Sequence, residues 1–256
     1  MAETVAAATA VTQDAFLGGR LLLHQPAEGH RAGSDAILLA AAAPESISGL
    51  ALDIGAGVGA AGLSLAALRP GLTFGLVEND PSLAALARTN ITVNGFGQSG
   101  SVYEADLLDP QSRAAAGLLD GSAALIISNP PFLDAARVRS SPKASKRSAH
   151  VMPDGATLEG WITACLALLM DGGQLILIHR PDALPEMLAA LQRRAGDIGL
   201  LPIHPQAGKP AMRILLRARK GSRGPLAIAP PLVLHEAGRF TPAADALHRG
   251  ETLIAW

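Results

Sequence analysis

The chain has 256 residues, of which 49% are hydrophobic and only 3% aromatic, and its formal net charge is −1. This composition is sufficient for one α/β domain with an aliphatic core, and the charge excludes a global field that would draw the protein onto nucleic acid. A single cysteine, Cys165, excludes an intrachain disulfide and fits a reducing, cytoplasmic environment. No apolar run reaches the ~18 residues that a membrane span requires, so no membrane-spanning segment is expected.

The N-terminal part predicts an extension that precedes the main fold. Residues 1–15 are expected to be disordered, and residues 16–24 suggest a short hairpin. Ser34 or Asp35 is expected to cap a helix that runs through Ala43 and stops at Pro44. We therefore expect a single domain over 16–256, with 16–45 as a substrate-side extension.

From residue 50 onward, apolar strands alternate with Ala/Leu-rich helices. The expected strands cover residues 50–54, 73–77, 101–103, 123–128 and 174–179. One expected helix ends at Leu68, and three others cover residues 81–94, 158–170 and 185–194. Two late strands, 212–218 and 226–234, have a polar turn between them and predict an antiparallel hairpin at the sheet edge. The fold class predicted is α/β, a Rossmann-like, doubly wound and mostly parallel sheet.

A glycine-rich loop follows the first of these strands and has two interpretations. Residues 57–62 satisfy the G-x-G-x-x-G pattern of dinucleotide-binding proteins, which leaves an NAD-dependent oxidoreductase as an alternative. However, Asp53 precedes Gly55, Gly57 and Gly59, and its carboxylate would repel a pyrophosphate. That carboxylate suits the ammonium group of S-adenosylmethionine, although it could also simply cap the next helix.

Two further carboxylates follow neighbouring strands. Glu78 ends the second strand and could accept hydrogen bonds from ribose hydroxyls of either cofactor. Asp106 follows the third strand and could accept from the adenine amine of S-adenosylmethionine, or could be a solvated loop residue. Together with Asp53 they favour the methyl donor.

The sharpest local signal is the sequence Asn129-Pro130-Pro131-Phe132 after the fourth strand. Prolines stiffen the backbone and remove amide donors, so the Asn129 side-chain carbonyl and the Pro130 main-chain carbonyl can act as a pair of acceptors. Such a pair matches the two hydrogens of a planar NH2 group and directs its lone pair at an electrophilic methyl. Phe132 offers a face on which a base can stack. A rigid Pro-Pro loop without catalytic function is the alternative.

With these motifs, the chain resembles class I methyltransferases that carry an Asn-Pro-Pro-aromatic motif, and in particular bacterial tRNA (adenine-N6)-methyltransferases. The resemblance rests on residues 30–39, 52–59 and 126–132. It implies that Asp53, Gly55, Gly57, Gly59, Glu78 and Asp106 hold S-adenosylmethionine, that Ser34 and Asp35 lie near the cofactor or target, and that residues 129–132 hold an adenine amine in tRNA. Phe132 departs from the tyrosine of many relatives. Guanine N2 in rRNA and a protein glutamine remain alternative acceptors.

A basic segment directly follows the catalytic motif and is a candidate RNA contact. The cations of this segment are Arg137, Arg139, Lys143, Lys146 and Arg147. Arg31, far upstream in the chain, is a further candidate RNA contact. A second basic group around the late strands consists of Arg213, Arg217, Arg219, Lys220 and Arg223. Cations that meet phosphates add salt-dependent affinity, whereas charge runs are often only solvated surface. With one cysteine and scattered histidines, no metal site is expected.

Overall fold

The protein is built around one large sheet, seen in a computed structural model that describes residues 10–29, 31–131 and 156–256. Its parallel part contains β3 (Leu50–Ile54), β4 (Phe74–Glu78), β5 (Gly100–Glu104), β6 (Ala123–Ser128) and β7 (Leu169–His179), in the order β7-β6-β3-β4-β5. The inner strands are nearly continuous apolar runs because both faces of the sheet are covered. The predicted doubly wound fold is confirmed.

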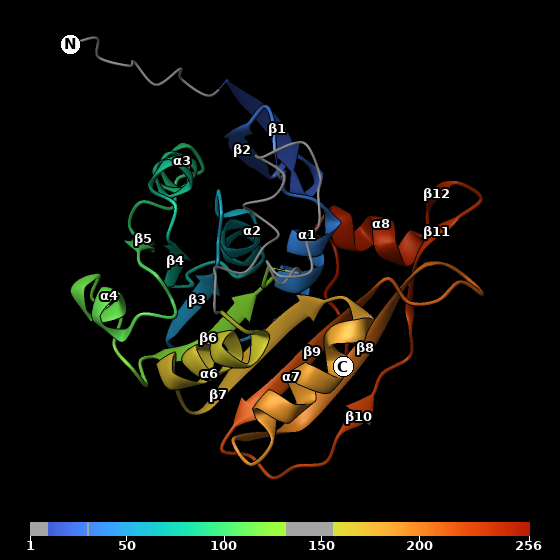
Figure 1. Ribbon diagram of the computed structural model, residues 1–256. Coiled ribbons are helices and arrows are strands. Elements are labelled where there is room, and N and C mark those ends of the chain that lie inside the picture. Colours follow the sequence, from blue (N-terminus) through green and yellow to red (C-terminus); the bar gives the residue numbers. More distant parts are fainter. Residues whose placement is uncertain (1–9, 30, 132–155) are drawn as a thin grey trace, which may run out of the picture.

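Helices cover both faces of the sheet (Figure 1). One layer holds α1 (Ser34–Ala41), α2 (Ala60–Leu68), α3 (Pro81–Val93) and α8 (Pro242–His248). The opposite layer holds α6 (Leu158–Leu168) and α7 (Leu184–Leu191), with the short α4 (Pro110–Ala115) beside it. Each layer buries its own aliphatic cluster against the sheet. Among the residues that the structure describes, no helix has the length and apolar character to cross a membrane.

The helix starts follow local signals in part. Asp80 caps α3 by accepting from the backbone N–H groups of Ser82 and Leu83, and Pro81 occupies the first turn as expected. The expected cap of α1 is wrong, because Gly33 is its N-cap and no side chain caps it. The side chains of Ser34 and Asp35 are used in tertiary contacts instead, and α1 ends at Ala41 rather than Ala43.

An antiparallel hairpin of β1 (Val11–Phe16) and β2 (Leu21–Pro26) precedes α1, joined through the short 3-10 turn η1 (Leu17–Gly19). The expected hairpin is therefore longer than predicted. Residues 11–15 belong to a strand, which differs from the disorder expected for 1–15; residues 1–9 lie outside the described part. The first strand alternates between exposed and half-buried positions, a pattern that the polar composition conceals.

The C-terminal strands pair differently from the prediction. β9 (Arg213–Lys220) lies antiparallel to both β7 and β8 (Ala195–Gln206), so the hairpin is β8–β9. The expected pairing of 212–218 with 226–234 is wrong, since β10 (Ala227–Ile228) and β11 (Leu232–Glu236) join β8 in parallel. β12 (Arg239–Phe240) completes the edge.

The reason for this error lies in the composition of β8. This strand contains two glycines and two prolines. Both residue types are unfavourable inside a strand, so the sequence does not predict a strand there. Two consecutive prolines, 230 and 231, also divide the region that was expected to be one strand. Pairing at the sheet edge is thus decided by long-range contacts.

Candidate active site

The two predicted motifs meet where the direction of the strand order reverses. From β3 the chain proceeds outward to β4 and β5, and then returns to place β6 on the other side of β3. Ile54 at the end of β3 lies in register with Ser128 at the end of β6. The glycine loop and the Asn-Pro-Pro segment therefore leave the same edge side by side, at the point where ligands bind in open α/β sheets.

The three glycines of the loop have distinct physical roles. Gly55, Gly57 and Gly59 all have positive φ angles, of 69°, 56° and 89°. A Cβ on Gly59 would lie 2.6 Å from Leu76 Cδ1, and one on Gly55 would lie 3.1 Å from the Trp161 ring. A Cβ on Gly57 would meet no described atom outside its chain neighbours within 4 Å. Gly57 therefore borders open space suited to a ligand, whereas the other two permit close packing.

Asp53 is buried beneath this loop. Its Oδ2 accepts a hydrogen bond of 2.8 Å from the backbone N–H of Gly62, in the first turn of α2. Burial raises the pKa of this carboxyl to about 7, the Gly62 hydrogen bond opposes the shift, and the charge of Glu78 adds to it. The geometry matches the helix-capping alternative, and the contact with an ammonium group remains a prediction.

Glu78 and Asp106 lie at the same edge: Glu78 is the last residue of β4, and Asp106 follows β5. Glu78 accepts from the backbone N–H of Gly57 through Oε2 at 2.7 Å and from that of Asp80 through Oε1 at 2.9 Å. Asp106 accepts from the N–H of Leu108 through Oδ1 at 2.8 Å. A carboxylate has about four lone-pair sites, so both groups retain acceptor capacity for hydroxyls or amines of a cofactor.

The Asn-Pro-Pro segment presents an acceptor that lacks a partner. Asn129 Oδ1 is buried and has no hydrogen-bond partner among the described residues. Burying such an atom unpaired costs ~1–3 kcal/mol, which points to a ligand that completes it. Pro130 is buried and Pro131 is half-buried. Phe132 lies outside the described residues.

A hydrogen-bond chain beneath Asn129 joins three elements and was missed by sequence reasoning. The indole N–H of Trp161 in α6 donates to Ser128 Oγ at 3.1 Å, and that hydroxyl donates to the carbonyl of Ile54 at 2.7 Å. Because Trp161 also packs against Gly55, it supports both loops. Trp161 is itself buried on the inner face of α6.

His179, at the end of β7, lies beside the same segment. The ring is buried, and burial lowers its pKa, while hydrogen bonds to the backbone of Arg180 and Pro131 oppose this shift. Contact with the Pro131 backbone makes the imidazole a support of the Asn-Pro-Pro loop.

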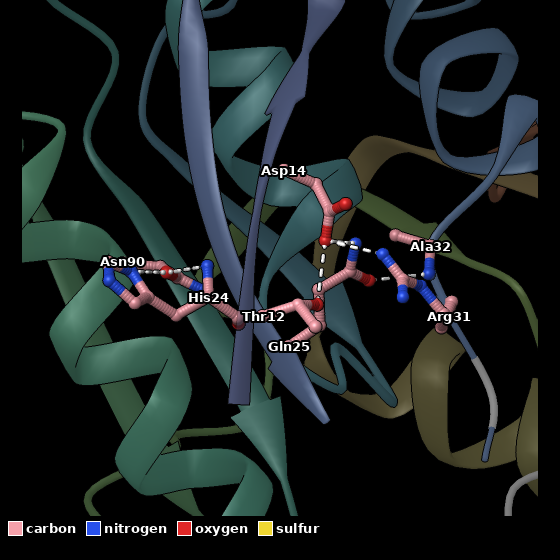
Figure 2. Close-up of polar contacts among 7 residues, drawn as sticks. All are labelled: Thr12, Asp14, His24, Gln25, Arg31, Ala32 and Asn90. Carbon is pink, nitrogen blue, oxygen red and sulfur yellow. Dashed lines mark hydrogen bonds and ion pairs between the residues drawn. The ribbon is translucent and has the colours of Figure 1, made fainter. Parts of the chain in front are cut away.

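The predicted residues of the N-terminal extension are engaged in polar contacts. The Asp35 carboxylate pairs with the Arg213 guanidinium at 2.8 Å, and Ser34 Oγ lies 2.8 Å from His248 Nε2. Arg31 pairs with Asp14 at 2.6 Å, as Figure 2 shows. Their proposed roles toward cofactor or RNA remain predictions.

The two basic groups have different outcomes. The first group, Arg137, Arg139, Lys143, Lys146 and Arg147, lies outside the described residues. The second group does not form one patch, because β9 extends it along the sheet: Arg213 is at the carboxyl edge, while Arg219 and Lys220 contact backbone carbonyls of Gly172 and Leu169 at the opposite edge. Within the described ranges, no three His, Cys, Asp or Glu residues gather as a metal site.

Comparison with known proteins adds independent information. The model of the methyltransferase small domain family matches residues 31–189. The tRNA1(Val) (adenine(37)-N6)-methyltransferase of Proteus mirabilis is 27% identical over 82% of each chain. The release factor glutamine methyltransferase of Bifidobacterium longum is 29% identical over 50% of this chain, which spans 46% of that relative. A solved structure from Agrobacterium tumefaciens, described as a predicted O-methyltransferase, has a TM-score of 0.71 and 33% identity over 87% of this chain and 99% of its own.

The sheet order and the loops at the switch point define a Rossmann-like domain. The chain belongs to the methyltransferase small domain family. It is an S-adenosylmethionine-dependent methyltransferase, and the family assignment decides against the NAD-dependent oxidoreductase. The open side of Gly57 and the carboxylates of Glu78 and Asp106 fit the predicted cofactor, with its ribose hydroxyls and adenine amine as donors.

Proposed function

We propose that this enzyme methylates the exocyclic N6 amine of an adenine in RNA, namely in a tRNA near the anticodon. The observation that carries the proposal is the buried Asn129 Oδ1, which has no partner among the described residues. An NH2 group would supply the missing donor.

The chemistry follows from the properties of a planar amine. Its lone pair is delocalised into the ring, so the nitrogen is a weak nucleophile. In this proposal Asn129 Oδ1 and the Pro130 carbonyl each accept one N–H, which shifts electron density onto the nitrogen and directs its lone pair outward. When bound, S-adenosylmethionine supplies an electrophilic methyl group. Because the amine loses its proton after attack, no strong base is required beforehand.

The choice of RNA is supported by the extent of similarity. The tRNA-modifying relative of Proteus mirabilis matches 82% of both chains, so the similarity extends beyond the residues 31–189 that the family model matches. The basic run that directly follows Phe132 contains five lysines and arginines and no acid over residues 135–153, which suits a polyanion.

A second candidate acceptor is the side-chain amide of a protein glutamine. It is favoured by the Bifidobacterium longum relative, whose similarity covers 50% of this chain. A glutamine amide is also a planar NH2 group, so Asn129 and Pro130 would hold it in the same way. The acceptor therefore has to be identified by experiment.

The test is incubation with methyl-labelled S-adenosylmethionine and either total tRNA or purified release factor, followed by digestion and mass spectrometry. We expect N6-methyladenosine from the tRNA and no label in the protein. Label in glutamine or in guanine N2 would overturn the assignment. The Asn129→Ala variant is the control, because it should remove product from every acceptor.

A further inference from the structure

Helix α3 closes the free edge of the N-terminal hairpin with two asparagines. Asn90 and Asn94 lie one turn apart and therefore face the same side. The Asn94 amide accepts from Leu22 N at 2.9 Å and donates to Leu22 O at 2.8 Å. The Asn90 amide accepts from His24 N at 2.8 Å and donates to His24 O at 3.0 Å. Each side chain thus replaces the next strand beside β2 and satisfies an otherwise unpaired edge.

The two asparagines differ in the destination of their remaining N–H. Asn94 donates to the carbonyl of Asn90, within its own helix, at 2.8 Å. Asn90 donates to the carbonyl of Val58, in the glycine loop, at 2.9 Å. Asn90 Oδ1 also lies 3.2 Å from His24 Nδ1. The Asn90 side chain is fully buried. The Asn90 side chain therefore joins the hairpin to the glycine loop.

Val58 is a sensitive position in that loop. It lies between Gly57 and Gly59, which both have positive φ angles. Because glycine can adopt many backbone conformations, this turn needs further contacts to hold a single conformation. A buried donor on the Val58 carbonyl fixes the peptide plane between them. A loop that is held in its binding conformation loses less entropy when a ligand binds.

Further polar contacts connect the hairpin to the segment before α1 (Figure 2). The buried Gln25 accepts from the N–H of Ala32 at 2.9 Å and donates to Asp14 Oδ2 at 3.0 Å. That oxygen also accepts from Thr12 Oγ1 at 3.0 Å and pairs with Arg31 at 2.6 Å. Glycine loop, hairpin and residues 31–32 are thus one hydrogen-bonded unit.

We propose that Asn90 is a positioning residue that makes docking of the N-terminal hairpin and binding of S-adenosylmethionine mutually dependent, through its bonds to His24 and Val58. Coupling of this kind is reciprocal: if the docked hairpin favours cofactor binding, the cofactor stabilises the docked hairpin to the same degree. The proposal concerns the cofactor and is independent of the nature of the acceptor.

The test compares Asn90→Asp with the matched control Asn94→Asp. Both changes keep the side-chain shape and an acceptor, and both remove one N–H donor to a β2 carbonyl. The second donor that is lost differs: Asn90→Asp releases Val58, whereas Asn94→Asp releases only the Asn90 carbonyl within α3. By calorimetry, we expect the dissociation constant for S-adenosylmethionine to rise about tenfold or more in Asn90→Asp and about threefold or less in Asn94→Asp. Unchanged affinity in a folded Asn90→Asp protein, or equal losses in both variants, would overturn the proposal.

A second measurement uses the unmodified protein and decides the question even if Asn90→Asp does not fold. Amide hydrogen exchange of the hairpin is followed with and without S-adenosylmethionine. The cofactor should slow exchange at Leu22 and His24, because it stabilises the docked hairpin. Exchange at these amides that is indifferent to a saturating cofactor would contradict the coupling, whatever the variants show.

Discussion

The indole N–H of Trp161 donates to the hydroxyl of Ser128, 3.1 Å away, in the residue directly before Asn129. Since Ser128 also bonds to the end of β3, this contact fixes the base of the Asn-Pro-Pro segment relative to the glycine loop. Through this contact, helix α6 holds the Asn-Pro-Pro segment, which we propose to bind the target amine, in place beside the glycine loop.

We expect Trp161→Phe to lower kcat about tenfold or more, because small misplacements of a catalytic group are costly, and to lower the free energy of unfolding by ~1 kcal/mol through the lost hydrogen bond. Steady-state kinetics and urea unfolding measure the two effects. Trp256→Phe is the control, since its indole N–H donates to Ala42 O at 2.8 Å, outside the site. A kcat loss of equal size in both variants would show a general stability effect.

Removing the buried acceptor should separate chemistry from cofactor binding. Asn129→Ala is expected to lower kcat about a hundredfold or more, while the dissociation constant for S-adenosylmethionine, measured by calorimetry, stays within about twofold. Asn129→Asp keeps a side-chain oxygen and should retain more activity than Asn129→Ala. If Asn129→Ala turned over at the normal rate, the two-acceptor arrangement would be wrong.

The central β-α units, and the meeting of the glycine loop and the Asn-Pro-Pro segment at one edge of the sheet, could be predicted because local patterns encode them. The strand 123–128 was predicted at its observed bounds, since a buried parallel strand is a continuous apolar run. The strand-end placement of Asp53, Glu78 and Asn129 followed directly from that alternation. Carboxyl ends of parallel strands share one edge, so the motifs had to meet there.

Contacts between remote residues could not be predicted in this way. The bond from Asn90 to Val58 spans 32 positions and depends on how α3 packs beside the hairpin. The glycine pattern alone also could not separate the roles of its members. A Cβ on Gly59 would clash with Leu76, whereas a Cβ on Gly57 would face open space, and only its φ of 56° favours glycine there. In each case the deciding partner comes from another element.

The Asp53 carboxyl should make the stability of the fold depend on pH. Burial raises its pKa to about 7, above the ordinary 3.8. The folded state therefore retains a proton that the unfolded chain releases at lower pH, so this contribution to stability is complete below pH ~3.8 and is lost as pH rises through ~7. We expect the free energy of unfolding to fall by up to about 3 kcal/mol between roughly pH 5 and pH 8 from this group.

Urea unfolding of the Asp53→Asn variant at the same two pH values tests this assignment. The variant should lack this part of the fall, because its side chain does not titrate. Asp109→Asn is the control, since Asp109 caps α4 as an exposed carboxylate, and it should keep the normal fall. Identical pH dependence in the normal protein and in Asp53→Asn would contradict a buried, proton-holding carboxyl.

The basic run after Phe132 should contribute to RNA affinity through its charge. We expect reversal of Lys143, Lys146 and Arg147 to Glu to weaken tRNA binding about tenfold or more at moderate salt, to reduce its dependence on salt concentration, and to leave cofactor affinity unchanged. Filter binding at several salt concentrations measures this.

The control for that experiment reverses Arg193 and Arg194, which are exposed and directly precede β8, on the side of the sheet away from the site. Because any loss caused only by the change in net charge would appear in both proteins, a selective loss in the first assigns the phosphate contact to the basic run. If tRNA bound both charge-reversed proteins and the normal protein equally, the basic run would not contact phosphates, and the RNA would have to be held by other residues.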